Sequence, residues 1–367
     1  MTSAPRTADR YVDHAGRIGA ASPTYAAWSR SVAGSVPVVA VLDRVPPTKR
    51  QPELVFAVAR RLGADPADPG AIVDVVLRDP DGFVDELAAA TMQANDPQRM
   101  AAVLPLFAEV DGPIGIVDVG ASAGLCGIPD RVTLDYEITR GRDVGSRAGR
   151  SGADGVGAGA GPDRVRMVTS RASGSGSGSG PASSTGAGSI VLRARASGWV
   201  PAPFASPDVV ARVSLDPSPI DLDAPGAFDR LVEAVPPEAT DRTTLMRAAA
   251  SVARTVPPVR VVGGVPDDLE RALAALPAGC TPVVVTMGTL VYVPGAARQE
   301  FIDSVRRLGV RWIAMERTGI LHGVAATLPG AVDPADPAAF ATVSIDGEAR
   351  AVADAHGTAV RWLGRGT

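Results

Sequence analysis

The sequence has few of the residue types that build metal clusters, disulfide frameworks or stacking surfaces. Its 367 residues include three histidines and two cysteines, Cys126 and Cys280, which lie far apart. Two distant cysteines support neither a metal cluster nor a disulfide framework, so we expect no bound metal and a cytoplasmic location. Aromatic residues make up only 4% of the chain, which argues against a stacking platform for single-stranded nucleic acid.

An excess of charge and long apolar runs are also missing. The net charge is −4, from 36 basic and 40 acidic residues, so bulk charge attracts neither nucleic acid nor an anionic membrane. The apolar runs are short and broken by Pro, Gly or charge, and the N-terminal stretch lacks the apolar core of a signal peptide. Hydrophobic residues still make up 46% of the chain, which is enough for two domains or one large domain with additions.

The pattern of the chain changes at about residue 112. Residues 1–112 are predicted to be helical because apolar side chains recur at helical spacing, as in the stripe from Met100 to Phe107. Residues 113–367 are predicted to form a second domain. Within it, residues 139–189 consist largely of Gly, Ser, Ala and Arg, and we expect them to be a disordered insertion.

Outside that insertion, the second domain alternates short apolar runs with amphipathic stretches. Such alternation predicts parallel strands joined by right-handed helical crossovers. Asp346-Gly347 between two alternating runs predicts an antiparallel hairpin near the C-terminus. We therefore predict an α/β fold with a mostly parallel sheet that ends in this hairpin. The predicted strands are 114–119, 209–215, 259–262, 283–285, 310–315, 341–345, 349–353 and 358–363.

The residues that carry chemistry follow the first predicted strand. The segment Asp118-Val-Gly-Ala-Ser-Ala-Gly124 lies at a strand end, where open parallel sheets bind ligands. Glycine at 120 and 124 lets the backbone turn tightly and approach a ligand, and 125–131 is expected to start a short helix. The alternative is a turn required only by packing. The spacing is neither G-x-G-x-x-G nor that of a P-loop, so pyrophosphate binding is disfavoured.

The pattern Asp-x-Gly-x-Ser-x-Gly resembles the first motif of class I S-adenosylmethionine-dependent methyltransferases, with Ser122 in place of the middle glycine. In that fold the next strand ends in an acid that binds the ribose hydroxyls. Asp216 matches this position, although aspartate before proline is also common in turns. The resemblance implies a Rossmann-like methyltransferase sheet and S-adenosylmethionine as the cofactor. The cofactor site that it implies consists of Asp118, Gly120, Ala121, Ser122, Gly124, Asp216 and Gly264.

Most of the chain outside the insertion also resembles the bacterial family called domain of unknown function 2332. This family implies a methyltransferase-like Rossmann domain behind a helical N-terminal part, with no known substrate. The chain departs from the family after Gly264, where Val265-Pro266 stands in place of the usual acid. In the segment 93–99, Ala94 and Asp96 replace the threonine and the glutamate of the family's Q-T-N-E pattern. The matching stretches are Ser22-Pro-Thr-Tyr25, Arg50-Gln-Pro52, Gln93–Arg99, Val117–Leu125, Leu215–Asp221, Thr281–Val285, Glu316 and Asp354-Ala-His-Gly357.

Two titratable residues are candidates for catalysis. Glu316 follows a predicted strand and would bind a substrate amine or act as a general base, unless it is a surface acid paired with Arg317. His356 is a candidate proton acceptor, although a lone histidine in an Ala-His-Gly turn is often structural. Cys126, beside the glycine turn, would be a nucleophile only with a base nearby in space.

Asn95 is a third catalytic candidate. With Asp96 and Pro97 it has the pattern of a helix start, in which a capping side chain is followed by proline. The family segment implies instead that Asn95 closes over a substrate pocket together with Gln93 and Arg99.

These observations favour an S-adenosylmethionine-dependent methyltransferase that acts on an unknown acceptor, most simply a small molecule. Methyl transfer requires mainly that the protein align donor and acceptor and exclude water, so few obligatory side chains are expected. The alternative is a non-catalytic or degenerate Rossmann-like binding protein, which leaves open whether the chain is an enzyme. An NAD-linked oxidoreductase is disfavoured by the glycine spacing. We expect no nucleic-acid or membrane partner, and the oligomeric state cannot be inferred.

Overall fold

The computed structural model describes residues 6–93, 95–139, 165–168, 190–202 and 204–364. Of the predicted insertion at 139–189, only Thr139 and Val165–Val168 belong to these described residues. Val165–Val168 forms a strand, which the prediction of a disordered insertion did not foresee.

The chain folds into two compact units. One comprises Met1–Asn95 and Ile220–Ala250, and the other comprises Asp96–Pro219 and Ser251–Thr367. The sequence placed the division at residue 112. The units differ from that prediction because the chain changes unit at Asp96 and because residues 220–250, distant in sequence, pack with the N-terminal helices.

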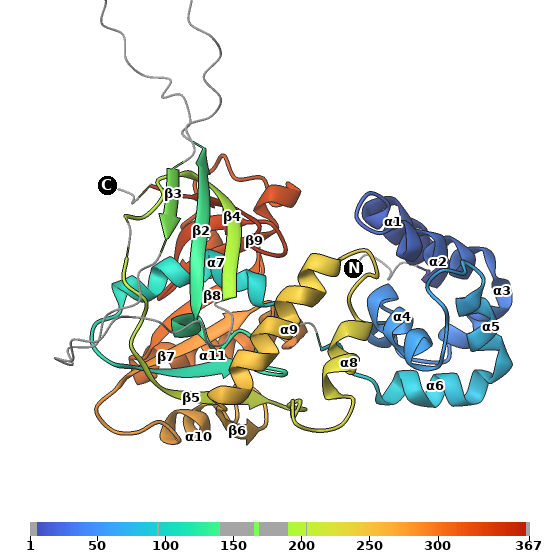
Figure 1. Ribbon diagram of the computed structural model, residues 1–367, viewed down its shortest axis with the longest axis horizontal. Helices are drawn as coiled ribbons and strands as arrows, with labels where there is room; N and C mark the ends of the chain where they lie inside the picture. Colours follow the sequence, from blue (N-terminus) through green and yellow to red (C-terminus); the bar gives the residue numbers. More distant parts are fainter. Residues whose placement is uncertain (1–5, 94, 140–164, 169–189, 203, 365–367) are drawn as a thin grey trace, which may run out of the picture. The chain divides into compact units, whose positions relative to one another are not determined.

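The first unit is helical (Figure 1), and several of its helices begin with proline. Pro23, Pro52 and Pro80 occupy first helical positions, where a missing N–H leaves no hydrogen bond unmade. Tyr11, Tyr25, Trp28 and Phe56 form an aromatic cluster at its centre, all fully buried. The helices are α1 (Thr7–Ile18), α2 (Pro23–Gly34), α3 (Val36–Leu42), η1 (Pro47–Lys49), α4 (Pro52–Arg61), α5 (Ala71–Arg78), α6 (Pro80–Ala89), α8 (Ala227–Glu233) and the first part of α9 (Thr240–Thr255).

The segment that follows α8 is attached to the N-terminal helices by the Ser22-Pro-Thr-Tyr25 stretch. The Ser22 hydroxyl donates to Glu238 Oε2 at 2.6 Å, and the Thr24 N–H donates to Glu238 Oε1 at 2.8 Å. The Tyr25 hydroxyl donates to the Glu233 carbonyl at 3.1 Å. These contacts explain why residues 220–250 belong to the helical unit.

Arg60 satisfies the backbone carbonyls where α8 ends. Its Nη1 lies 3.2 Å from the Val232 oxygen, 2.9 Å from that of Glu233 and 2.6 Å from that of Val235. The last carbonyls of a helix have no partner within the helix, and a cation there also suits the helix dipole.

We therefore expect Arg60→Met to destabilise the helical unit by about 2–3 kcal/mol, since charged hydrogen bonds to buried carbonyls are lost. Arg61→Met is the matched control. Arg61 forms a surface ion pair with Glu86 at 3.2 Å, and its loss is expected to change stability by less than about 1 kcal/mol. Urea unfolding followed by far-ultraviolet circular dichroism measures both. Equal effects of the two substitutions would contradict this role of Arg60.

The second unit is built on one mixed, mostly parallel sheet. Its described strands have the order β3-β2-β4-β11-β10-β9-β8-β7-β1-β5-β6. Neighbours from β8 to β6 are parallel, as are β2 with β4 and β4 with β11, whereas the remaining pairs are antiparallel. The strands are β1 (Ile114–Val119), β2 (Val132–Thr139), β3 (Val165–Val168), β4 (Ile190–Gly198), β5 (Val209–Asp216), β6 (Val259–Val262), β7 (Thr281–Met287), β8 (Arg311–Arg317), β9 (Ala341–Ile345), β10 (Glu348–Ala353) and β11 (Ala359–Trp362).

Five parallel strands form the part of the sheet that positions the candidate site. Their order, β6-β5-β1-β7-β8, places the first strand of the unit in the middle, with β5 and β6 on one side of it and β7 and β8 on the other. Such a reversal of strand order is where open α/β sheets bind ligands, at the carboxyl ends of the strands. All six residues of β1 are buried, as expected of a central parallel strand.

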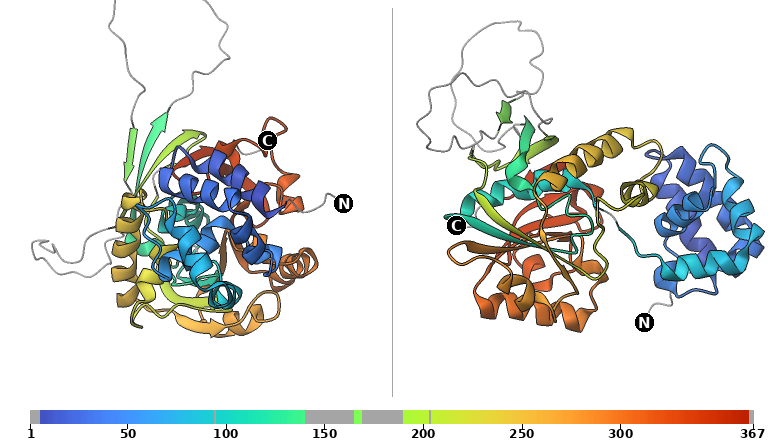
Figure 2. Two further views of the ribbon diagram at one scale, coloured as in Figure 1. Left: turned by 90° about the vertical axis from the view of Figure 1, so that its right-hand side faces the viewer. Right: turned by 60° about the horizontal axis from the view of Figure 1, so that its bottom comes forward.

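The remaining strands extend the sheet beyond β8. β9 and β10 form the predicted antiparallel hairpin around Asp346-Gly347. β11 then pairs with β4, and β3, β2 and β4 lie side by side (Figure 2). The short helix α7 packs against β4, β8 and β9. The helices of this unit are η2 (Pro97–Arg99), α7 (Met100–Val103), η3 (Leu104–Glu109), η4 (Pro129–Arg131), α10 (Leu269–Ala274), η5 (Leu290–Tyr292), α11 (Gly295–Leu308), α12 (His322–Ala325), η6 (Pro337–Ala339) and the end of α9.

None of the described helices combines the length with the apolar character that crossing a membrane requires.

Candidate functional site

The glycine turn that follows β1 is hydrogen-bonded to the carboxyl end of the neighbouring strand β5. The backbone takes positive φ at Gly120 (72°), Ser122 (51°) and Gly124 (72°). The Gly120 N–H donates to the Leu215 carbonyl at 2.8 Å, and the Ser122 N–H donates to Asp216 Oδ2 at 2.8 Å. Asp216 Oδ1 accepts from the Ser218 N–H at 2.7 Å. Asp216 therefore holds the turn that follows β1 against the end of β5.

The end of β7 supports the same turn from the other side. Thr289 Oγ1 donates to the Val119 carbonyl at 3.0 Å, and its side chain fills the space where a Cβ on Gly120 would stand. Glu316, at the end of β8, accepts from the N–H groups of Thr289 and Leu290, each at 3.1 Å. Glu316 thus acts through Thr289 on Gly120, which is a positioning role.

Glu316 lies at the carboxyl end of a strand, as the sequence suggested. It is not a surface acid paired with Arg317, because only 1% of it is exposed and both carboxylate oxygens accept backbone N–H groups. Burial raises its pKa to about 7, against the lowering effect of these two hydrogen bonds and of nearby Arg99.

Two buried polar atoms at the end of β1 and in the turn after it have no hydrogen-bond partner among the described residues. They are Asp118 Oδ2 and Ser122 Oγ, and the two residues are 5% and 6% exposed. Burial, and then the charge of Asp216, raises the pKa of Asp118 to about 7. Tyr11, Ser344 and Trp362 also carry such atoms, but Asp118 and Ser122 lie at the edge where open α/β sheets bind ligands, which makes these two atoms an indication of a ligand there.

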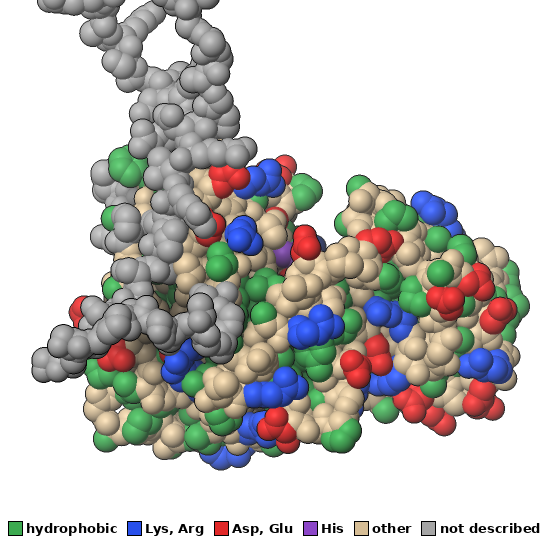
Figure 3. Space-filling view, viewed as in Figure 1, with side chains coloured by type: hydrophobic (Ala, Val, Ile, Leu, Met, Phe, Trp, Pro, Cys, Tyr) green, Lys and Arg blue, Asp and Glu red, His purple; other side chains and the backbone are tan. Residues whose placement is uncertain are grey.

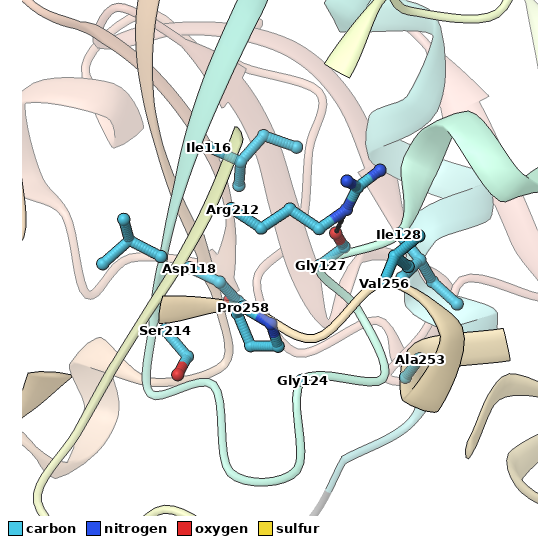
Figure 4. A pocket seen from close by; sticks show the side chains of 11 residues that line it. Ile116, Asp118, Gly124, Gly127, Ile128, Arg212, Ser214, Ala253, Val256 and Pro258 are labelled. Atoms are coloured by element: carbon cyan, nitrogen blue, oxygen red, sulfur yellow. Dashed lines mark hydrogen bonds between the residues drawn. The ribbon is translucent and has the colours of Figure 1, made fainter. Parts of the chain in front are cut away.

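Asp118 also lines a small, partly open pocket beside β1 and β5 (Figure 4). Arg212 closes one side of it, with Nε donating to the Gly127 carbonyl at 3.1 Å and the guanidinium paired with Asp130. The pocket is lined by Ile116, Asp118, Gly124, Gly127, Ile128, Arg212, Val213, Ser214, Ala253, Val256 and Pro258.

A second polar cluster lies next to the glycine turn. Cys126 Sγ donates to the Asp96 carbonyl at 3.3 Å, and Asp96 Oδ2 lies 2.8 Å from His356 Nδ1. Arg99 donates to the Ala355 carbonyl at 3.2 Å and, from Nη1, to the Met287 carbonyl at 3.1 Å at the end of β7. Burial raises the pKa of the Cys126 thiol well above its ordinary value, so Cys126 lacks the character of a nucleophile.

Three further residues predicted from the sequence, Ala121, Gly264 and Asn95, lie in different parts of the second unit's edge or next to it. Ala121 is buried in the turn, and Gly264 follows β6, where the Gly263 N–H donates to the Asp216 carbonyl at 3.0 Å. Asn95 is 5% exposed and directly precedes Asp96, and Asp96 is the residue that caps η2. The helix expected over 125–131 is wrong, because these residues form turns and end in the 3₁₀ helix η4.

The sequence analysis missed Thr289 and the pairing of Asp96 with His356. Thr289 follows a strand by two residues and could have been suspected from that position alone. Asp96 and His356 lie 260 residues apart, and no local pattern predicts such a contact. No group of three or more metal-ligating side chains occurs in the described part of the chain.

Ser122 adopts a left-handed conformation that favours glycine. We expect Ser122→Gly, which restores the glycine of the motif, to stabilise the chain by about 1 kcal/mol, because it relieves the positive φ and removes an unpartnered buried hydroxyl. Thermal unfolding of the two proteins measures this difference. A destabilised variant would mean that the hydroxyl makes a contact that stabilises the unliganded fold.

Together these features define an α/β protein with a candidate ligand site at the carboxyl ends of its central parallel strands. Residues 8–362 match the model of a family described as "Uncharacterized protein conserved in bacteria (DUF2332)", and the chain belongs to that family. Neither the curated proteins nor the solved structures include a match to the chain.

Proposed function

We propose that the chain is an S-adenosylmethionine-dependent methyltransferase whose cofactor lies against the glycine turn after β1. The observation that carries this proposal is the pair of buried, unpartnered atoms Asp118 Oδ2, near the end of β1, and Ser122 Oγ, in that turn. They lie beside Asp216, an acid at the end of the adjacent parallel strand.

The strand order supports the same proposal. In the order of their appearance along the chain, the five parallel strands are arranged 3-2-1-4-5, as in a Rossmann-like fold, with the turn at the point of reversal. Asp216 places a carboxylate at this edge, which suits a cationic sulfonium better than an anionic ligand. The chain differs from the methyltransferase pattern in lacking a helix directly after the turn.

The residues present fit the cofactor. Asp118 and Ser122 offer hydrogen bonds to its amino-acid part, and Gly120 and Gly124 allow close approach of the backbone. Each oxygen of Asp216 accepts one backbone N–H and retains a lone pair for a ribose hydroxyl. Gly264 follows the neighbouring strand, on the side expected for the adenine. When bound, the cofactor supplies an activated methyl group, and the chain aligns the acceptor and excludes water.

A non-catalytic binding protein is the second candidate, and the burial of the site favours it. Residues 121–129 are all buried, and the neighbouring pocket is small, so little of the turn is open to a ligand. This candidate predicts ligand binding without turnover, whereas the methyltransferase predicts that S-adenosylhomocysteine forms when an acceptor is supplied.

A small-molecule acceptor remains our expectation. On the face shown in Figure 3, acidic and basic side chains are interspersed among the described residues rather than gathered by sign. Such a surface gives no basic groove that would follow a nucleic-acid backbone.

Calorimetric titration with S-adenosylmethionine and S-adenosylhomocysteine tests the proposal. We expect both to bind, and Ser122→Ala to weaken binding about 3- to 10-fold through the loss of one hydrogen bond. Ser344→Ala is the matched control, because Ser344 Oγ is also buried without a partner among the described residues but lies within strand β9. Absence of binding at millimolar ligand concentration would overturn the proposal.

A further inference from the structure

We infer that His356 is the proton acceptor of this site, oriented by Asp96, and that the methyl acceptor carries a neutral O–H or N–H group. This inference rests on the proposed methyltransferase function. It assigns a base, a positioning residue and a substrate class.

The geometry of the pair is that of a histidine oriented by a buried carboxylate. His356 Nδ1 lies 2.8 Å from Asp96 Oδ2, and the side chain of Asp96 is 1% exposed whereas that of His356 is 46% exposed. Asp96 Oδ1 accepts from the Gln98 N–H at 3.1 Å, which fixes the carboxylate. A carboxylate only accepts hydrogen bonds, so Nδ1 carries the proton and, in the neutral ring, Nε2 presents its lone pair outward.

The turn that carries His356 is held from both sides. The His356 N–H donates to Asp354 Oδ1 at 3.1 Å, and Arg99 Nε donates to the Ala355 carbonyl at 3.2 Å. Gly357, with φ 72°, packs so closely on the segment 96–99 that a Cβ would lie 3.1 Å from the Gln98 carbonyl oxygen. The ring is thereby held in one orientation in the absence of a ligand.

The pair lies at the same edge of the sheet as the glycine turn. The Asp96 carbonyl accepts from Cys126 Sγ, two residues after Gly124, and Arg99 reaches the Met287 carbonyl at the end of β7. The charged groups that face His356 are therefore Asp96, Asp354 from its own turn, and Arg99, whose guanidinium is held by backbone carbonyls.

The reaction that suits this arrangement requires removal of a proton. A lone pair of the acceptor oxygen or nitrogen forms a bond to the methyl carbon, and the carbon–sulfur bond breaks with its electron pair left on sulfur. The acceptor proton passes to Nε2 of His356, and Asp96 stabilises the resulting imidazolium. A carboxylate or thiolate acceptor has no proton to lose and would gain nothing from the base.

The position of the proton can be read directly by NMR of the full chain labelled with ¹⁵N-histidine. The chain has three histidines, and we expect His356 to be the Nδ1–H tautomer when neutral. Asp96→Asn should increase the share of the Nε2–H tautomer. A wild-type His356 in the Nε2–H form would overturn the inference, whether or not any acceptor is found.

Turnover tests the role as a base. With S-adenosylmethionine and a series of phenols, alcohols and amines, His356→Gln is expected to lower kcat about 100-fold or more, with cofactor affinity unchanged. The effect should vanish for nitrophenols that are already ionised at the assay pH. His322→Gln, which alters an exposed histidine at the start of α12, is the control.

The outcomes separate the two proposals. Cofactor binding with a kcat that is insensitive to His356→Gln for un-ionised acceptors overturns the present inference and leaves the methyltransferase standing. Failure of the wild-type chain to bind the cofactor overturns the methyltransferase, and with it the role of His356 in methyl transfer. If no acceptor in the series turns over, the tautomer of His356 decides whether the oriented pair exists.

Discussion

Gly120→Ala is expected to abolish cofactor binding and to destabilise the second unit by about 3–5 kcal/mol, from overpacking combined with a strained left-handed backbone. An added Cβ would lie 2.9 Å from Cβ of Thr289, and closer still to its Oγ1 and Cγ2. The backbone at Gly120 has φ 72°, which side-chain-bearing residues rarely adopt. Thr289 cannot retreat without losing its hydrogen bond to Val119 and shifting the backbone that Glu316 holds.

A control substitution at another glycine separates the effect of backbone strain from that of the steric clash with Thr289. Gly279 has φ 86°, but no atom lies within 4 Å of the position of its Cβ, so Gly279→Ala is expected to destabilise by only about 1 kcal/mol. The double variant Gly120→Ala, Thr289→Ala should recover part of the lost stability, as a positive coupling in a double-mutant cycle. Urea unfolding and calorimetric titration measure these effects. If Gly120→Ala lowered the free energy of unfolding no more than Gly279→Ala does, the turn would not be constrained by Thr289.

Asp118→Asn is expected to stabilise the chain at pH 8 and to leave it nearly unchanged at pH 4. Burial and the charge of Asp216 raise the pKa of Asp118 to about 7, whereas an unfolded aspartate has a pKa of about 3.9. The folded state therefore binds more protons between these values, so wild-type stability falls as pH rises from about 4 to 7. The full difference corresponds to about 4 kcal/mol, and asparagine carries no charge to be destabilised.

Urea unfolding of the two proteins at several pH values between 4 and 8 measures the effect. The difference in the free energy of unfolding should grow up to about pH 7 and then level off, by the same linkage. Asp303→Asn, which alters an exposed residue of α11, should stay within about 0.5 kcal/mol of the wild type throughout. A difference for Asp118→Asn that does not depend on pH would contradict the buried, protonated carboxyl.

The strands of the parallel core could be predicted from the sequence because each is a local pattern. The bounds of β1, β6 and β9 are those predicted, and Asp216 ends β5 as expected. The extension of the sheet by β2 and β4 was not predicted. Val132, Leu134 and Tyr136 are buried at alternate positions of β2, a period of two that was overlooked because the low-complexity stretch follows directly.

The candidate site could be predicted only where it is local in sequence. Gly120 and Gly124 predict the turn after β1, and the structure places Asp216 in contact with this turn. The burial of Glu316 and the pairing of Asp96 with His356 depend on how distant segments pack. After Gly124 the chain forms turns, and only the 3₁₀ helix η4 precedes β2, so there is no room for the expected α-helix.

A crystal structure of the chain with S-adenosylhomocysteine tests the central claim most directly. We expect the adenosyl group to lie over residues 120–124, the ribose hydroxyls to donate to Asp216, and Asp118 or Ser122 to contact the amino-acid part. Density for the nucleoside at any other place, or crystals at saturating ligand in which residues 120–124 remain covered by protein side chains, would contradict it.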